Sequence, residues 1–347
     1  MGKRNEYLDF CKGIAIILVI VGHCIEFGSG KEFSDSQLHL YNKIFIFIYS
    51  FHMPFFILFS GYLFHHSINK HSTEGLLKSR IETLLIPIVV WNIIYCLIQC
   101  RGMSAMEFIQ YYLNSCLTNA WFLWAVFINS IIILIINKLY NDNILIYSVI
   151  YILTYFITDD YNLHLYKYLY PFFLIGYLTN KNMDKIMEKV KKRRFIMVYL
   201  FIFSAMGYIL LLQFWNYNSY IYTSQYAIWN KPIFLQITIN IYRTFVGFFG
   251  SAAMIILLKI IFTYLKGALY WIKNFIIRIG KFSLGIYMSQ AVFLSFMATL
   301  TRNNHYNRYI SFLETFIILI LSYVATYIIS SNKITNKLFL GGRKQST

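Results

Sequence analysis

Apolar runs long enough to cross a lipid bilayer recur along most of this chain. A membrane-spanning helix needs about 20 mainly apolar residues, and the stretches between the runs are too short to form domains. We place spanning helices near residues 8–27, 44–65, 81–99, 119–137, 143–158, 165–180, 195–213, 235–258, 282–300 and 310–331. The sequence therefore predicts an all-α, polytopic integral membrane protein with about ten transmembrane helices in one domain, residues 1–332.

The composition agrees with this class and excludes one obvious alternative. Of the 347 residues, 58% are hydrophobic and only 13% are charged, which lies outside the usual range of soluble proteins. The net charge of +17 would also suit a nucleic-acid-binding protein. However, Lys and Arg lie in the connections between spans, as in cytoplasmic loops, so we expect a lipid bilayer and no nucleic acid as partner.

The distribution of Lys and Arg also predicts the orientation. These residues are concentrated in alternate connections, including the basic run from Lys189 to Arg194, and cytoplasmic loops carry such an excess. We therefore expect both termini in the cytoplasm and His23 in the outer half of the first helix. The run would serve as a topology anchor or as a patch for anionic lipids. The segment 333–347 is short, polar and basic, which predicts a frayed cytoplasmic tail.

Two features of the termini and cysteines exclude other interpretations. Lys3 and Arg4 precede an apolar core, as in a signal peptide, but no small-x-small cleavage motif follows, so we expect the first helix to be retained. The five cysteines are an odd number and have no metal-ligand spacing. We predict neither a metal site nor a disulfide framework.

The first apolar run carries ionisable residues at both of its ends: Asp9, Lys12, His23 and Glu26. Lys12 and His23 are about three helical turns apart, so they share one face and differ in depth by about 16 Å. Ionisable groups at membrane depth cost several kcal/mol unless they face a bundle interior or a watery cavity. The stripe indicates a functional site, although end charges that snorkel and a hydrogen-bonded core histidine would also fit.

The second apolar run offers another histidine at a comparable depth. His52 precedes Pro54, which we expect to bend the helix and open a polar pocket. Two histidines on neighbouring helices indicate a proton-handling site, whereas a bond from His52 to a carbonyl freed by Pro54 is the simpler alternative. Ser60 and Gly61 favour close helix packing over a nucleophile, because no glycine-flanked serine elbow accompanies them.

The second inner connection carries Lys78 and Arg80. A compact pair of cations at the cytoplasmic interface suits the phosphates of a nucleotide-like donor, although the general excess of cations on that side would also place them there. Trp121 and the aromatic residues after it are typical of a membrane interface when taken alone.

Together and in this order, these elements resemble the acyltransferase-3 family of bacterial integral membrane O-acyltransferases. The similarity is greatest to its short branch of sugar or polysaccharide O-acetylases, which lacks an appended esterase domain. The matching elements are Leu8-Asp9, Lys12-Gly13, Gly22-His23, His52-Met53-Pro54, Ser60-Gly61-Tyr62, Arg80, Leu85-Ile86-Pro87, Trp121-Phe122-Leu123 and Gly280 to Tyr287. Two positions depart from the family pattern: Thr83 replaces a second arginine, and Gln290 replaces a histidine.

The resemblance implies transfer of acetyl from cytoplasmic acetyl-CoA to a hydroxyl of an envelope glycan or its lipid-linked precursor, in the cytoplasmic membrane. Acetyl-CoA would be a co-substrate, with no bound cofactor. His23 would be the general base, and Glu26 would orient its imidazole in the manner of a triad acid. The other implied site residues fall into two sets: Lys12, Lys78 and Arg80 for the donor phosphates, and Asp9, His52, Ser60, Tyr62 and Trp121 lining the pocket.

Two other classes of function stay open at this point. Helices around a polar pathway also suit a glycan exporter or flippase of the same family. A non-catalytic membrane scaffold is the second alternative, but it would bear the cost of buried Asp9, Lys12, His23 and His52 without using them. The sequence does not specify the acceptor sugar, the acylated hydroxyl or the oligomeric state.

Overall fold

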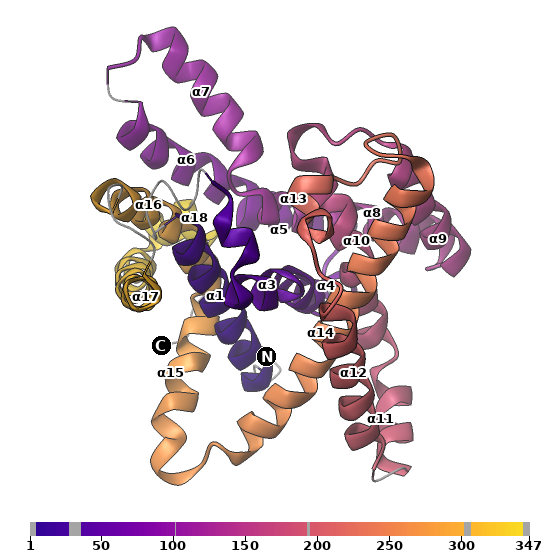
Figure 1. Cartoon of the computed structure of the whole chain (residues 1–347). Coiled ribbons are helices and arrows are strands. Elements are labelled where there is room, and N and C mark those ends of the chain that lie inside the picture. Colours follow the sequence, from indigo (N-terminus) through magenta and orange to yellow (C-terminus); the bar gives the residue numbers. More distant parts are fainter. Residues whose placement is uncertain (1–4, 28–35, 101, 193–194, 302–306, 343–347) are drawn as a thin grey trace. The chain divides into compact units, whose positions relative to one another are not determined.

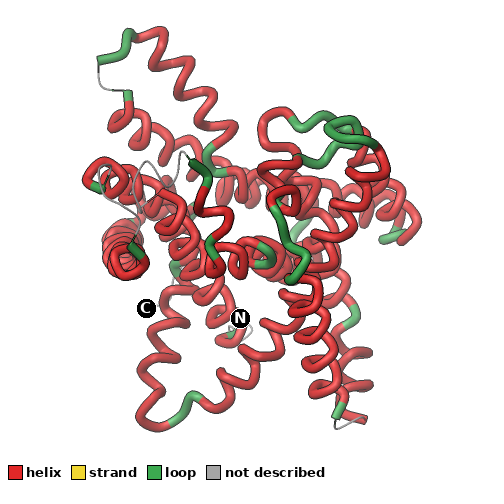
Figure 2. Tube along the Cα trace, in the orientation of Figure 1, coloured by secondary structure: helices red, strands yellow, loops and turns green. Residues whose placement is uncertain are grey.

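The computed structural model describes residues 5–27, 36–100, 102–192, 195–301 and 307–342. Within these ranges every regular element is a helix and no strand occurs (Figure 2), which confirms the all-α class. Lys3 and Arg4, the end of the basic run at 193–194, and residues 343–347 of the expected tail lie outside the described residues.

Seven helices of the described residues are long and apolar enough to cross a membrane, which supports the integral membrane class. They are Glu6–Phe27, Lys43–Lys70, Thr73–Gln99, Trp121–Tyr140, Ile233–Tyr264, Ser283–Leu300 and Arg308–Ser331. Two other expected spans, Ile144–Phe156 and Ile196–Leu212, form shorter apolar helices, and the third, Leu163–Lys181, is a more polar helix. A total of ten crossings and the cytoplasmic termini stay predictions.

The chain divides into two compact units, which we describe separately. Unit 1 comprises residues 1–48, 81–120 and 261–347, and unit 2 comprises residues 49–80 and 121–260. The helices wholly or mainly in unit 1 are α1 (Glu6–Phe27), α3 (Lys43–Tyr49), α6 (Ile86–Gln99), α7 (Ala105–Thr118), α15 (Tyr270–Lys281), α16 (Ser283–Leu300), α17 (Arg308–Ser331) and α18 (Lys333–Leu340). Those of unit 2 are α4 (His52–Lys70), α5 (Thr73–Arg80), α8 (Trp121–Tyr140), α9 (Ile144–Leu153), α10 (Leu163–Lys181), α11 (Met183–Lys192), α12 (Ile196–Leu212), α13 (Ile221–Ser224) and α14 (Ile233–Tyr264) (Figure 1).

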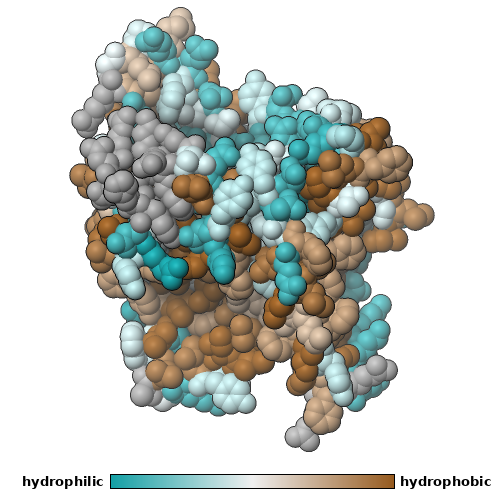
Figure 3. Space-filling view, viewed as in Figure 1, coloured by the Kyte–Doolittle hydropathy of each residue, from teal (hydrophilic) through white to brown (hydrophobic). Residues whose placement is uncertain are grey.

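Large apolar side chains remain exposed along the helices of unit 2. Leu200 and Phe203 of α12 and Phe245 of α14 are examples, and Figure 3 shows apolar side chains over these two helices. Soluble proteins rarely expose contiguous apolar surface of this kind, whereas lipid accepts it. The surface therefore agrees with a membrane environment.

In unit 1, α1 and α15 cross at two glycines. A Cβ on Gly13 would lie 2.2 Å from the carbonyl oxygen of Ile276, and a Cβ on Gly280 would lie 1.7 Å from that of Asp9. Only residues without a side chain allow backbones to approach this closely, as at other small-residue crossings in membrane helices. Gly13 and Gly280 therefore hold α15 against the segment of α1 that carries Asp9 and Lys12.

The expected frayed tail contains a folded helix, α18. Asn332 caps its start, with its side-chain oxygen 2.8 Å from the N–H of Ile334, and left-handed Gly341 ends it. Both residues are standard helix-terminus signals. The expectation of a frayed end is wrong for Lys333–Leu340, because these residues form a helix with a cap at each end and a buried last residue, Leu340.

Helix α18 packs on other helices of unit 1 through its last turn. Leu340 is fully buried, and the carbonyl of Phe339 accepts a hydrogen bond from the indole N–H of Trp91 at 3.1 Å. A Cβ on Gly341 would lie 2.4 Å from the Cα of Thr83. The polar composition of the tail thus concealed one docked apolar turn.

In unit 2, α4 and α10 cross at a second pair of glycines. A Cβ on Gly61 would lie 2.0 Å from the carbonyl oxygen of Phe173, and a Cβ on Gly176 would lie 2.0 Å from that of Leu58. The side-chain amide of Asn180 also donates to the carbonyl of Tyr62 at 2.6 Å. The structure therefore confirms that Gly61 serves close helix packing.

We expect Gly61→Ala to destabilise the protein by about 1–3 kcal/mol, the usual cost of overpacking. Alanine is the better helix former, so a loss of stability must come from the crossing. Thermal unfolding of the purified variant in detergent measures it. Gly75→Ala is the matched control, because a Cβ there meets only the Ser72 hydroxyl at 3.1 Å and a methylene of His71. Equal stability of both variants would contradict the close-packing role.

The expected span 44–65 is interrupted rather than bent at Pro54. Helix α3 ends at Tyr49 and α4 begins at His52, with Ser50 and Phe51 between them. Proline is tolerated in the first turn of a helix, where its missing N–H has no intrahelical partner. Pro54 occupies that turn, so the helix is interrupted just before it, and α3 and α4 together make up the apolar span Lys43–Lys70.

A buried carboxylate fastens the turn between α8 and α9. Asp142 accepts hydrogen bonds from Tyr147 at 2.6 Å and from Tyr177 and Asn137, and it forms an ion pair with Lys181 at 2.5 Å. Burial alone would raise the pKa of Asp142, but the bonds from Lys181, Tyr147, Asn137 and Tyr177 outweigh it and hold that pKa below its ordinary value.

This clamp should make stability depend on acid. A lowered folded-state pKa contributes stability above the ordinary Asp pKa, and that contribution is lost as the pH falls through the folded-state value. Asp142→Asn is expected to cost about 1–3 kcal/mol at pH 7 and less at pH 3–4. Thermal unfolding midpoints of both proteins from pH 7 to pH 3 measure the difference. A difference that does not shrink towards low pH would rule out an ionised clamp.

Candidate functional site

The N-terminal end of α1 holds an ion pair. The Lys12 ammonium lies 2.7 Å from the Asp9 carboxylate one helical turn earlier, and the two side chains are 17% and 3% exposed. The pairing lowers the cost of burying both charges, and the ammonium is partly exposed. The donor role expected for Lys12 stays a prediction.

The C-terminal end of α1 holds His23 and Glu26. The helix is continuous from Glu6 to Phe27, so Lys12 and His23 share a face about 16 Å apart, as helical geometry requires. His23 is partly buried, and its ring packs edge-on against Phe27 with the centroids 6.0 Å apart. Glu26 is partly buried one turn beyond His23. An imidazole that keeps some exposure is suited to exchange protons with a bound hydroxyl.

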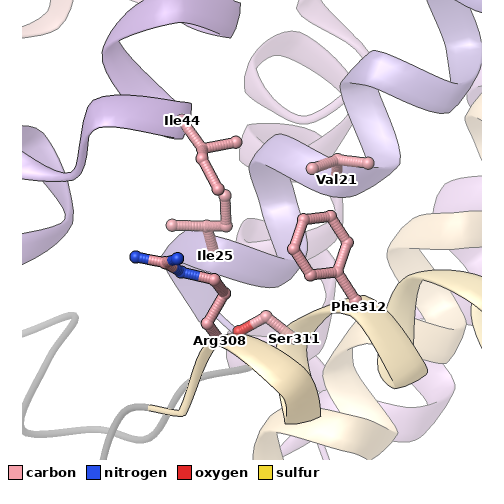
Figure 4. A pocket seen from close by; sticks show the side chains of 6 residues that line it. All are labelled: Val21, Ile25, Ile44, Arg308, Ser311 and Phe312. Atoms are coloured by element: carbon pink, nitrogen blue, oxygen red, sulfur yellow. The ribbon is translucent and has the colours of Figure 1, made fainter.

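A narrow cleft lies beside this end of α1 within unit 1. Its lining comes from three helices: Val21 and Ile25 of α1, Ile44 of α3, and Arg308, Ser311 and Phe312 of α17. In Figure 4, Ile25 lies beside Arg308 and Val21 beside Phe312, so α1 and α17 run in opposite directions here. Val21 and Ile25 lie on the opposite side of α1 from His23, and the cleft therefore does not open on the histidine.

Helix α17 carries a buried acid that the sequence analysis did not single out. Glu314 is 2% exposed, and neither of its carboxylate oxygens has a hydrogen-bond partner among the described residues. The thiol of Cys24 bonds the Thr315 side chain and lies within electrostatic range of Glu314. Glu314 is therefore close to the level of His23 along the helix pair.

Helical geometry puts Glu314 and His23 on the same side of this helix pair, but within the described residues neither Glu314 oxygen has a hydrogen-bond partner, so the imidazole is not bonded to it. Cys24 of α1 and Thr315 of α17 face each other. In an α-helix, consecutive side chains are rotated by about 100° around the helix axis. When two antiparallel helices touch at one residue each, the residues that precede the two contact residues point to the same side of the helix pair. Those residues are His23 and Glu314, and that side lies away from the cleft. An acidic residue inside the apolar run 310–331 was the sequence signal that would have found it.

The departure at Gln290 also leaves a buried polar group in unit 1. Gln290 lies on α16, which packs against both α1 and α17, and it is 1% exposed. Its carbonyl oxygen Oε1 has no hydrogen-bond partner within the part of the chain that the structure describes. Burying a polar group without a hydrogen-bond partner costs free energy, and this applies to the Gln290 amide and to the Glu314 carboxylate. Both residues show that the interior of unit 1 contains polar groups.

The expected pocket residues of unit 2 lie on α4 and α8. His52 is 3% exposed, and its ring lies 4.7 Å from that of Tyr49, centroid to centroid. Ser60 and Tyr62 are partly buried further along α4. Trp121 begins α8, partly buried, with its ring edge-on to Phe122. His52 thus lies at the start of α4, and Ser60 and Tyr62 lie two to three turns further along.

The cations of unit 2 that we expect to bind the donor, Lys78 and Arg80, lie in the last turn of α5. Lys78 is exposed, and the Arg80 guanidinium lies 4.7 Å from the centre of the Phe64 ring, a cation–π distance. A π-helical turn, Ile81–Leu85, follows Arg80 directly, and such turns are frequent at functional sites. Thr83 lies in this turn, at the position where many family members have a second arginine. Its backbone packs closely against Gly341.

The site residues therefore fall into two sets. Unit 1 holds Asp9, Lys12, His23, Glu26 and Glu314, and unit 2 holds His52, Ser60, Tyr62, Lys78, Arg80 and Trp121. The expectation that both sets line one cavity stays a prediction. An all-helical membrane protein with ionisable groups buried in its apolar helices belongs to the class of membrane-embedded enzymes and transporters.

Comparison with known proteins identifies the family. The acyltransferase-3 family model, described as an acyltransferase domain, matches residues 5–331, and the chain belongs to this family of acyl-transferring enzymes. The chain is 32% identical over 181 residues to nodulation protein NolL of Mesorhizobium japonicum, covering 51% of this chain and 48% of the relative. It is 29% identical over 206 residues to nodulation protein NolL of Sinorhizobium fredii, covering 57% and 54%. The chain thus spans about half the length of the curated relatives it matches, and no solved structure matches it.

Proposed function

We propose that this protein is a membrane-bound O-acetyltransferase. It moves acetyl from cytoplasmic acetyl-CoA to a hydroxyl of a cell-envelope or exported glycan, or of its lipid-linked precursor, in the cytoplasmic membrane. The observation that carries this is the continuous helix α1, which presents Lys12 and His23 on one face about 16 Å apart. That offset suits a phosphorylated donor at the inner surface and an acceptor on the outer side.

His23 acts as the general base in this proposal. Its imidazole takes the proton of the acceptor hydroxyl while the oxygen attacks the thioester carbonyl of acetyl-CoA. The carbon–sulfur bond then breaks, and the imidazolium returns the proton to the departing CoA thiolate. A thioester is already activated, so raising the nucleophilicity of the hydroxyl is the main task. Either the pantetheine arm reaches His23, or a residue carries the acetyl group in transit.

A carboxylate orients the imidazole and stabilises its charged form, as in triad enzymes. The sequence offers Glu26 on the same helix. The structure adds Glu314, which is more deeply buried and has no competing partner within the described residues. An uncompensated carboxylate inside a helix bundle is costly, and an imidazolium formed on the same side during the reaction would offset that cost. Glu314 is therefore a second candidate for this role, beside Glu26.

The donor phosphates are bound by Lys12, Lys78 and Arg80. CoA carries several negative charges that cannot enter hydrocarbon unpaired, and guanidinium and ammonium groups are the usual phosphate partners. Asp9 holds Lys12 in place through the 2.7 Å ion pair. His52, Ser60, Tyr62 and Trp121 line the path of the pantetheine arm and the acceptor.

Purified protein in liposomes tests the assignment. With labelled acetyl-CoA on one side and an envelope glycan on the other, we expect labelled, alkali-labile acetyl esters on the glycan. Movement of the glycan across the bilayer without acetyl-CoA would instead identify an exporter. Mass spectrometry of surface glycans from cells with and without the gene then identifies the sugar and the hydroxyl.

A further inference from the structure

Helix α14 of unit 2 carries a buried polar stripe although it is apolar enough to cross a membrane. Gln236, Asn240 and Arg243 follow one another at spacings of four and three residues, which places them on one face. Gln236 and Asn240 are fully buried and Arg243 is 1% exposed. Three such groups inside one spanning helix are costly unless each has a partner or a function.

The two amides of the stripe hold the loop before α14. Gln236 Nε2 donates to the carbonyl of Gln225 at 3.2 Å, and Asn240 Nδ2 donates to the carbonyl of Tyr226 at 2.8 Å. On the other side, Asp159 accepts the backbone N–H of Tyr226 at 2.9 Å and also bonds Ala227 and the side chain of Asn230. The loop is thus fixed from two directions.

The fixed loop is strained at Gln225. Its φ of 56° and ψ of −154° lie in a region that is essentially restricted to glycine. A non-glycine residue stays there only where its surroundings impose the conformation, and such strain gathers at functional sites. The neighbouring residue, Ser224, touches the third member of the stripe.

Arg243 differs from the amides because it is only partly satisfied. Its Nη2 donates to the Ser224 hydroxyl at 2.6 Å and its Nε to the carbonyl of Ile239 at 3.4 Å. Its Nη1 has no hydrogen-bond partner, and no carboxylate forms an ion pair with it, in the ranges that the structure describes. Asp159, the acid within electrostatic range, is already paired with Lys167 at 2.5 Å.

We propose that Arg243 binds an oxyanion of the acceptor, a carboxylate or phosphate carried by the glycan or by its lipid anchor. This rests on the proposed function and adds an acidic acceptor to it. A guanidinium binds such groups in two parallel hydrogen bonds. Within the described residues Nη1 has no hydrogen-bond partner, and in the proposed complex the Ser224 hydroxyl yields Nη2 to the anion. The anion then compensates a buried charge that the protein leaves unpaired.

Thermal unfolding with small anions tests the site without acetyl-CoA. Wild-type protein in phosphatidylcholine nanodiscs is heated with glucuronate, with inorganic phosphate or with neutral glucose. A ligand that binds the folded state alone raises the unfolding midpoint, and we expect a rise of about 2–4 °C with either anion at saturation. Glucose should cause no rise. No rise with either anion, or an equal rise with glucose, would overturn the proposal.

Variants locate the effect. Arg243→Gln should abolish the rise, whereas Lys231→Gln, in the same loop region, should keep it. If Arg243→Gln does not fold, Arg243→Lys carries the test: it retains the charge without the two-pronged geometry, and glucuronate should bind about tenfold more weakly. Ser224→Ala should keep the rise or enlarge it. An undiminished effect in the Arg243 variants would overturn the proposal.

Two further arms separate the sources and the two proposals. A rise on replacing part of the phosphatidylcholine with phosphatidic acid, absent in Arg243→Gln, assigns the anion to a lipid anchor, whereas a rise with glucuronate alone assigns it to the sugar. Anion binding by a protein that never transfers acetyl would refute the proposed function but keep this site. Acetyl transfer without any effect of anions would do the reverse.

Discussion

Replacing His23 by Ala is expected to lower acetyl transfer by about 10²–10⁴-fold, the usual contribution of a positioned general base. The ring of His23 packs against Phe27 at the end of α1, so its removal should leave the fold intact. Transfer of labelled acetyl from acetyl-CoA to glycan in membrane vesicles measures the loss. Immunoblots of the same vesicles show whether the variant reaches the membrane.

His71→Ala is the matched control for this experiment. His71 is exposed between α4 and α5, and its loss should leave activity unchanged. Near-normal transfer by the His23 variant would remove this residue from the mechanism. Equal losses in both variants would show that the assay responds to expression rather than to chemistry.

Glu314→Gln is expected to lower acetyl transfer by about 10²-fold or more, because the imidazolium would lose its carboxylate partner. The variant should be at least as stable as the wild type, since a buried carboxylate without a partner is replaced by a neutral side chain of the same shape. Activity in vesicles and the thermal unfolding midpoint are measured together. A purely structural role would lower both.

Glu26→Gln is the natural comparison, since Glu26 is the acid that the sequence places one turn from His23. If Glu314 is the partner, Glu26→Gln should retain most of the activity and Glu314→Asp should recover part of it. A larger loss in Glu26→Gln than in Glu314→Gln would assign the orienting role to Glu26 instead.

Hydrophobicity was sufficient to predict where most helices lie, because a spanning helix must satisfy its own backbone over about 20 residues. Hydrophobicity alone was insufficient to predict the shorter or more polar helices. Helices α7, α11, α15 and α18 are too short or too polar to be recognised as spans. The interruption at Ser50 and Phe51 was missed for a related reason: Pro54 indicates that a helix is perturbed, but tertiary packing decides where it stops.

The candidate site was predictable where one helix carries it. Helical periodicity alone places Lys12 and His23 on one face of α1, and the continuous helix agrees. Glu314 needed the structure, because its relation to His23 depends on how α17 packs against α1, as the Cys24 contact with Thr315 shows. Arg243 lies inside an apolar run of the sequence, but only the packed loop shows that one of its nitrogens has no hydrogen-bond partner among the described residues.

The docking of α18 has a practical consequence for work on this protein. A designer guided by polarity would trim the chain after Asn332 or fuse an affinity tag there. Such a truncation would remove the buried side chain of Leu340 and the Phe339 carbonyl that accepts the hydrogen bond of the Trp91 indole. Fusions are therefore better attached after Gly342, which is exposed.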